Sequence, residues 1–274
     1  MRIFWTVFLY LWLGTTAYSA EITIDPPHFQ GKTNVIGILI EGEIQKGDYE
    51  KLHSMIKNTH GGRERIYLGS QGGDLLEALK IGRLIRKLNI TTIAPLMLKS
   101  SKLSMPFLLV KAKKENLVCA SSCFFILASG IMRSGGIIGI HRPYLSKDEY
   151  LSIGEKDAIK ASVKLRKILE DYLIEMNMPS SFIERMYKIS GSDMEWLDTD
   201  PGQPDHKYFS GPIPEVTDWV EARCPVNEAD GKLQKFNQTK CFMEKIFESS
   251  CQAWFEEYAP NTPMQNRNCK WNFG

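Results

Sequence analysis

Short apolar runs alternate with amphipathic stretches along the first third of the chain. The runs at 35–40, 65–68 and 90–94 have the length and β-rich composition of buried strands. The stretches at 48–56 and 75–88 carry apolar residues at helical spacing. This strand–helix–strand order predicts an α/β fold with a parallel β core.

The second of these helices has a start signal of its own. Asp74 and Glu77 have the spacing of a capping box, in which each side chain binds a backbone N–H at the start of the helix. We expect the charged side chains of this helix to point outward. They are Glu77, Lys80, Arg83 and Lys87.

The middle of the chain continues the pattern after an interruption. Residues 96–115 show no periodicity and are predicted to be an insertion, whereas 117–119 return to the core. Residues 121–128 are apolar on nearly all sides and predict a buried helix, and the strand at 136–140 ends at His141. A long amphipathic helix is predicted over 155–177, and its expected core face is Ala158, Ala161, Leu165, Ile168, Leu169 and Tyr172.

The N-terminal residues 1–20 have the pattern of a secretory signal peptide. Arg2 precedes an apolar stretch at 3–13, which is too short for a membrane-spanning helix of roughly 20 residues. Small residues follow, and the pattern Ala17-Tyr18-Ser19 fits cleavage after Ser19, with cleavage after Ala20 as an alternative. We therefore expect a periplasmic or secreted protein; an uncleaved N-terminal anchor is the other interpretation.

Composition narrows the functional class. The chain has 274 residues, of which 43% are hydrophobic and 24% charged, which excludes a disordered chain and a polytopic membrane protein. Because 34 basic residues nearly balance 32 acidic ones, charge gives no argument for a nucleic-acid partner. The histidines and cysteines match no zinc-binding spacing, so neither a metal nor a cofactor is predicted.

The chain changes character near Gly202, where Pro, Asn and Cys become more frequent. We therefore divide it into a signal peptide at 1–20, an α/β domain at 21–201 and a Cys-rich C-terminal extension at 202–274. The extension is interpreted as a small appendage outside the α/β core. Three roles stay open for it: covering the active-site entrance, docking on a neighbouring subunit, or binding a partner.

The six cysteines are expected to form disulfides in an oxidising compartment. If a helix starts between Cys119 and Cys123, their Cα atoms lie about 6 Å apart, which permits a bond. Cys241 and Cys251 fall in a helix predicted at 239–258, about 15 Å apart and too far to bond. If the first pair forms, the remaining pairs are Cys224–Cys241 with Cys251–Cys269, or Cys224–Cys251 with Cys241–Cys269.

Three motifs are candidates for chemistry. Ser70-Gln71-Gly72-Gly73 lies between a strand and a capped helix, where backbone can approach a ligand closely. Cys119-Ala120-Ser121-Ser122-Cys123 opens the buried helix, so Ser121 is either a helix cap or a nucleophile. Ile140-His141-Arg142-Pro143 places a histidine at the end of a strand, where function often resides.

Taken together, these motifs resemble the ClpP/crotonase superfamily, which includes the proteolytic subunit of the Clp protease, over about residues 34–200. The patterns Cys-x-Ser-x-Cys at 119–123 and Gly-x-His-Arg at 139–142 are similar to those of exported bacterial relatives. The resemblance implies a ClpP/crotonase-like fold with Ser121 as nucleophile and His141 as general base. It also implies an oxyanion hole from the backbone N–H groups of Gly72 and Ser122; the hydroxyl of Ser122 is the fallback nucleophile.

The third member of a catalytic triad is less well defined. Aligned on Leu197, the family's acid falls at Met194, and Asp193 is one residue away. Asp193 is therefore the candidate acid, with a simple turn residue as its alternative. A Ser–Lys dyad would need Lys160 or Lys164, but both fall on the polar stripe of the helix at 155–177.

The sequence thus predicts an exported, ATP-independent serine hydrolase, most simply a peptidase that acts on peptides or proteins. No ATPase partner is expected, and relatives of the fold suggest a homo-oligomer. The principal alternative is a non-catalytic binding or scaffold protein of the cell envelope. An acyl-CoA enzyme of the crotonase type is a third interpretation, although CoA substrates are not expected outside the cytoplasm.

Overall fold

A computed structural model describes residues 19–25, 35–59, 61, 64–95, 117–143, 152, 154–190, 193–224 and 231–270. Two expectations from the sequence therefore lie outside the described residues. One is the apolar stretch at 3–13, since residues 1–18 are not among those described. The other is the insertion at 96–115.

The main sheet has six strands in the order β1–β2–β3–β4–β6–β9. The four central strands run parallel, as the alternation of apolar runs and helices predicts for β2, β3 and β4; β6 was not predicted. Both edge strands are antiparallel to their neighbours, and neither was predicted. The bounds are Glu21–Asp25 (β1), Ile36–Glu41 (β2), Glu64–Gly69 (β3), Thr91–Ile93 (β4), Met132–Ser134 (β6) and Ser210–Pro212 (β9).

A second, smaller sheet stands beside the main one. It contains β5 (Cys119–Ala120), β7 (Ile138–Ile140) and β8 (Glu195–Trp196), in the order β5–β7–β8. β5 and β7 are parallel, so the residues that follow them emerge at the same edge. Ser121 follows β5 and His141 follows β7, so the two residues come together at this edge.

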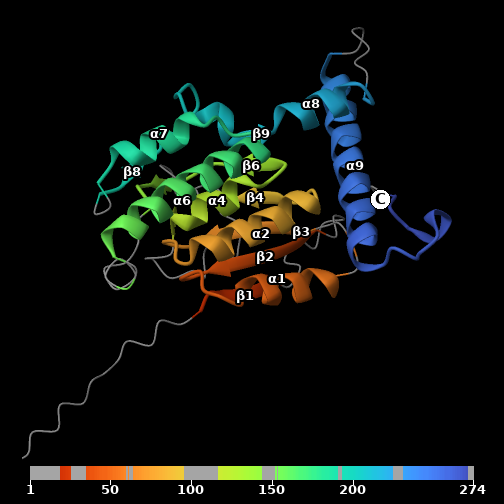
Figure 1. The fold of residues 1–274 in the computed structure, drawn as a ribbon. Coiled ribbons are helices and arrows are strands. Elements are labelled where there is room, and N and C mark those ends of the chain that lie inside the picture. Colours follow the sequence, from red (N-terminus) through yellow and green to blue (C-terminus); the bar gives the residue numbers. More distant parts are fainter. Residues whose placement is uncertain are drawn as a thin grey trace, which may run out of the picture.

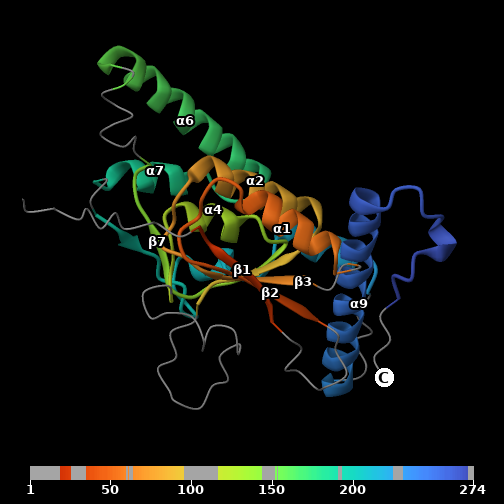
Figure 2. The same cartoon turned by 90° about the horizontal axis from the view of Figure 1, so that it is seen from below.

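Helices cover the sheet. Figure 2 shows α1 and α2 on one side of the main sheet, with α6 beyond them. Buried aliphatic residues of β2 and β3 pack under these helices with the aromatic rings of Phe124 and Phe125 on α4. The bounds are Asp48–Lys57 (α1), Leu75–Lys87 (α2), Ser122–Ala128 (α4), Glu155–Glu175 (α6), Ser181–Lys188 (α7), Pro214–Glu221 (α8) and Gly231–Tyr258 (α9), with short 3₁₀ turns at His206–Tyr208 and Met264–Asn266.

The start of α2 corrects one detail of the sequence analysis. Asp74 caps the helix as predicted, because its carboxylate accepts the N–H of Glu77 at 2.9 Å. The reciprocal half of the box is replaced: the Glu77 carboxylate accepts from the N–H groups of Gly47 (2.8 Å) and Tyr49 (2.9 Å). Glu77 is only 1% exposed, so the prediction that it points outward was wrong.

The predicted helix over 155–177 is present as α6. Ala158, Leu169 and Tyr172 are buried as expected, and Leu173 is buried with them. The other three residues assigned to its core face are only half-buried: Ala161, Leu165 and Ile168.

The C-terminal extension takes part in the fold in two ways. Its residues Ser210–Pro212 form β9, so the segment after Gly202 supplies an edge of the main sheet as well as an appendage. Its long helix α9 stands at one end of the strands, whereas α6 and α7 lie toward the other end (Figure 1). Within the described residues, none of the helices combines the length and the apolar character needed to cross a bilayer.

Side chains of α9 dock on the last turn of α1 and on the residues that follow α2. Trp254 Nε1 donates to the carbonyl oxygen of Ile56 at 3.0 Å, and Ser250 Oγ donates to that of Asn89 at 2.7 Å. These positions precede β3 and β4, at the amino ends of the strands. Three disulfides are formed: Cys119–Cys123, Cys224–Cys241 and Cys251–Cys269. The structure thus selects the first of the two predicted pairings.

Candidate active site

The Ser70–Gly73 turn is fixed by main-chain contacts between the two sheets. Ser70 follows β3 and is fully buried. Its N–H donates to the carbonyl oxygen of Val118 at 2.8 Å, and its own carbonyl accepts the N–H of Ala120 at 3.0 Å. The chain therefore leaves the main sheet and pairs with β5, which brings the glycine turn directly against Ser121.

Ser121 itself has an unusual backbone. Its φ of 56° with ψ of −124° is a conformation that costs a non-glycine residue on the order of 1–3 kcal/mol. The N–H of Ser121 donates to the carbonyl oxygen of Gly139 at 2.9 Å, and the Cys119–Cys123 disulfide spans the same bend. A strained serine at a strand-to-helix turn is the geometry in which hydrolases present a nucleophile.

His141 reaches Ser121 from the end of β7. The distance from His141 Nε2 to Ser121 Oγ is 2.6 Å, and both residues are half-buried. His141 Nδ1 lies 2.9 Å from the carbonyl oxygen of Arg142, which can only accept. This hydrogen bond assigns the proton to Nδ1 and leaves Nε2 to accept the Ser121 hydroxyl proton. The Arg142 guanidinium in turn donates to the carbonyl oxygen of Tyr187 at 2.8 Å.

Glycine is required at Gly72 and Gly73 for different reasons. A Cβ atom on Gly72 would lie 2.6 Å from the Cβ of Ser121, so any side chain there would displace the serine. A Cβ on Gly73 would overlap the carbonyl oxygen of Ile44. Ile44 binds this turn on both sides: its N–H donates to the Gly72 carbonyl at 2.8 Å, and its carbonyl accepts the N–H of Asp74 at 2.7 Å.

The predicted oxyanion donors differ in how they are engaged. The N–H of Ser122 has no hydrogen-bond partner among the described residues, whereas that of Gly72 donates to Ser70 Oγ at 3.0 Å. Gly73, which the sequence analysis did not select, is bridged to Ile44 through its neighbours Gly72 and Asp74, and its own N–H has no hydrogen-bond partner among the described residues. The Ser122 hydroxyl is buried without a partner in the described structure, so Ser121 is the serine that contacts His141.

The candidate acid, Asp193, lies in the exposed loop before β8. Its N–H donates to the carbonyl oxygen of Ser190 at 3.1 Å, and no hydrogen bond joins its carboxylate to His141 in the described part of the chain. Ile140 pairs with Glu195, which places Met194 opposite His141 in the β7–β8 register. The side chain of Met194 packs over Gly139 on the same face. Glu195 is not available either, because its carboxylate binds Arg185.

Other candidate groups lie away from Ser121. Lys160 pairs with Asp157 at 3.2 Å on the exposed face of α6, and Lys164 is exposed on the same helix. A cavity of about 680 Å³ is lined by residues of 134–138, 196–201 and 206–210, and neither Ser121 nor His141 is in its wall. The described residues contain no group of three or more His, Cys, Asp or Glu side chains suited to a metal ion.

Comparisons with known proteins give little information about the function of this chain. No protein-family model matches it, and no curated protein sequence matches it. Among solved structures, it is similar to a mutant of ClpP1 from Listeria monocytogenes, at 15% sequence identity and a TM-score of 0.42. The alignment covers 63% of this chain and 86% of that one. The chemistry proposed below therefore depends on the geometry around Ser121.

Proposed function

We propose that the protein is a serine hydrolase that cleaves peptides without an ATPase, with Ser121 as nucleophile and His141 as general base. The observation that carries the proposal is the 2.6 Å contact from His141 Nε2 to the hydroxyl of a strained serine. Hydrogen-bond contact between a nucleophile and a base, with the base oriented by a third group, is the signature of an activated serine. The third group here is the carbonyl oxygen of Arg142.

The reaction would follow the acyl-enzyme route. His141 Nε2 takes the Ser121 proton as Oγ attacks the substrate carbonyl carbon, which gives a tetrahedral oxyanion. The N–H of Ser122, together with that of Gly72 once Ser70 Oγ releases it, would donate to this oxyanion. The protonated His141 then gives its proton to the leaving amine, and water hydrolyses the acyl-enzyme by the same steps in reverse order.

The setting proposed for this chemistry is a cell envelope or the extracellular space. Three disulfides agree with an oxidising compartment. We retain a ClpP/crotonase-like fold, a homo-oligomer and a cleaved signal peptide as parts of the proposal. Asp193 would join as the acid only after a local rearrangement of the loop before β8.

A non-catalytic binding role is the second candidate, and two observations favour it. Met194 rather than a carboxylate faces His141 across the β7–β8 pair, and the Gly72 N–H is already bonded to Ser70 Oγ. In such a protein the glycine turn would bind the main chain of a partner, and Ser121 would have no unusual reactivity.

Labelling with a fluorophosphonate probe separates the two candidates. We would compare the mature, oxidised protein with Ser121→Ala, His141→Ala and Ser122→Ala, the last as a matched control one residue away. The hydrolase predicts labelling that disappears with Ser121→Ala, falls at least about 100-fold with His141→Ala and persists with Ser122→Ala. Labelling of folded protein no higher than that of Ser121→Ala would contradict the hydrolase and favour the binding role.

A further inference from the structure

The predicted cleavage point lies inside the folded structure. Ser19 forms a bridge with Glu43, and Ala20 is only 3% exposed, packed against Gly42, immediately before β1. If cleavage follows Ser19, the new N-terminal residue is therefore already part of the core. A free N-terminus in such a place needs a partner for its ammonium group.

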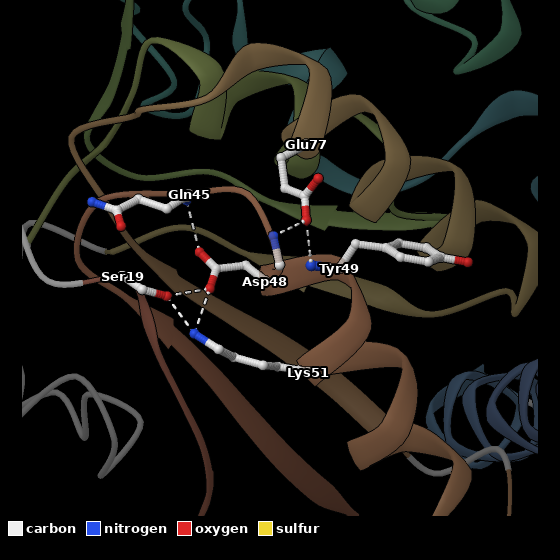
Figure 3. Close-up of polar contacts among 7 residues, drawn as sticks. Ser19, Gln45, Asp48, Tyr49, Lys51 and Glu77 are labelled. Atoms are coloured by element: carbon white, nitrogen blue, oxygen red, sulfur yellow. Dashed lines mark hydrogen bonds and ion pairs between the residues drawn. The ribbon is translucent and has the colours of Figure 1, made fainter.

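Asp48 supplies a carboxylate at this point (Figure 3). It is fully buried at the start of α1, and one of its oxygens accepts the Ser19 hydroxyl at 2.6 Å and the Lys51 ammonium at 2.9 Å. Its other oxygen accepts the N–H of Gln45 at 2.8 Å. The Lys51 ammonium also donates to Ser19 Oγ, while half of the Lys51 side chain is exposed.

We propose that Asp48 is the binding site for the α-ammonium group of Ala20, created by cleavage after Ser19. A signal peptidase would hydrolyse the Ser19–Ala20 amide: water adds hydroxide to the Ser19 carbonyl carbon and a proton to the Ala20 nitrogen. At neutral pH the new amine binds a further proton. The Ala20 nitrogen is four covalent bonds from Ser19 Oγ, so the new chain end would have to shift to place its ammonium where the departing hydroxyl lay.

The charges around this position suit a cation. Asp48 is the buried carboxylate and Glu43 adds an exposed one, while Lys51 is the nearby cation and can turn its half-exposed side chain toward solvent. The hydrogen bond lost with Ser19 is replaced by one from a charged donor, which is the stronger kind.

The same carboxylate is connected to the glycine turn beside Ser121. Asp48 holds the N–H of Gln45, and the adjacent Ile44 binds Gly72 and Asp74. Glu77 fixes the far side of this segment through Gly47 and Tyr49 (Figure 3). The ammonium–Asp48 pair would therefore order residues 44–49 and, through them, the turn. Only this last step, the ordering of the turn beside Ser121, rests on the proposed hydrolase function.

The first test is thermal unfolding of mature forms prepared by removing a tag in vitro. One form begins with Ala20, a second begins with Ala20 carrying an N-acetyl group, and a third begins with Ser19. We expect acetylation to lower the midpoint by about 3 °C or more. The form that begins with Ser19 keeps the hydroxyl bond to Asp48 but moves the ammonium by one residue, so its midpoint should lie between those of the other two forms.

The same comparison in Asp48→Asn completes a double-mutant cycle, and acetylation should then have little effect. If Asp48→Asn fails to fold, the three N-terminal forms of the natural chain still decide the matter. Equal midpoints for Ala20 and acetyl-Ala20 would overturn the proposal, as would an exported protein whose intact mass shows a start elsewhere than Ala20.

Hydrogen exchange tests the connection to the turn without reference to catalysis. The N–H of Asp74, bonded to Ile44, should exchange at least about threefold faster in the acetylated form than in the free form. Unchanged exchange over residues 70–76 would limit the ammonium to a role in stability and overturn the connection. Because neither readout uses a substrate, both are independent of the outcome of fluorophosphonate labelling.

Discussion

The two ends of the main sheet are built from different kinds of contact. At the carboxyl ends of the parallel strands, Ser70 and Ile44 hold the glycine turn through main-chain hydrogen bonds, and Gly139 holds Ser121 in the same way. At the amino ends, α9 is held by side chains such as Trp254. The ion pairs from Glu257 to His53 and Lys87 belong to that second end.

This difference has a physical consequence. Main-chain bonds fix the backbone around Ser121 and leave the side chains there available for chemistry, but they tolerate no added atoms. Side-chain contacts at the α9 end bury apolar surface, and they contribute mainly to the stability of the fold. Substitutions at the first end should change reactivity more than stability, and those at the second end the reverse.

Trp254→Ala should give the largest effect. Trp254 is 8% exposed, packs against Tyr258 and donates to the Ile56 carbonyl, so its removal should cost roughly 3–5 kcal/mol of unfolding free energy. The midpoint of thermal unfolding should fall by roughly 10 °C, measured by circular dichroism. Below that midpoint, the rate of Ser121 labelling per folded molecule should stay within about twofold of the natural protein; a large loss of labelling would show that the two ends are coupled.

Gly72→Ala reverses that pattern. Its Cβ would lie 2.6 Å from the Cβ of Ser121, so we expect the fluorophosphonate labelling rate to fall by about 100- to 1,000-fold. Gly202→Ala is the matched control, because Gly202 also has a positive φ but no atom within 4 Å of an added Cβ. Both variants should lose similar stability from backbone strain, and a similar loss of labelling in both would refute the steric explanation.

The disulfides Cys119–Cys123, beside Ser121, and Cys251–Cys269, at the α9 end, allow the two ends to be compared with one kind of bond. By loop length, Cys251–Cys269 should stabilise the chain by about 3 kcal/mol and Cys119–Cys123 by about 2 kcal/mol. Replacing each pair with alanine should therefore lower the unfolding free energy in that order. Labelling should respond in the opposite order, since only Cys119–Cys123 spans Ser121. Equal labelling rates in the two double variants would mean that the main chain alone holds the serine.

Sequence patterning predicted the parallel strands β2, β3 and β4 and the helices between them, whereas the pairing of Ser121 with His141 was implied by the family resemblance. The structure brings the two residues together because β5 and β7 are parallel and end at one edge. Patterning failed where a tertiary contact decided the outcome. Its spacing places Glu77 both in a capping box and on the polar face of the helix. Its carboxylate instead binds the N–H groups of Gly47 and Tyr49, which are distant in sequence, and the side chain is therefore buried. The strand β9 was missed because its three residues, Ser210–Pro212, have no apolar periodicity.

Met194→Asp tests how the base His141 is oriented at the end of the sheet that holds Ser121. Met194 faces His141 in the β7–β8 register, so an aspartate there would accept the Nδ1 proton in addition to the Arg142 carbonyl. We expect the labelling rate to rise by about tenfold, because an acid that stabilises the histidine cation favours attack by the serine. Met194→Asn is the control of similar shape without the charge. A rate unchanged in both variants would show that the main-chain carbonyl already orients the base fully.

Glu257→Gln should give the smallest effect, and its pH dependence carries the information. The hydrogen bond from Lys87 lowers the pKa of Glu257, and the contact with His53 adds to this while burial opposes it. A carboxylate whose pKa falls on folding adds stability above its unfolded pKa, and that stability is lost as the pH drops through the folded pKa. The pair is partly exposed, so Glu257→Gln should cost less than about 1 kcal/mol at pH 7. Denaturant unfolding at pH 7 and pH 3 should show the two proteins converging at the acidic value. A difference as large at pH 3 as at pH 7 would assign the contribution of Glu257 to packing rather than to its ion pairs.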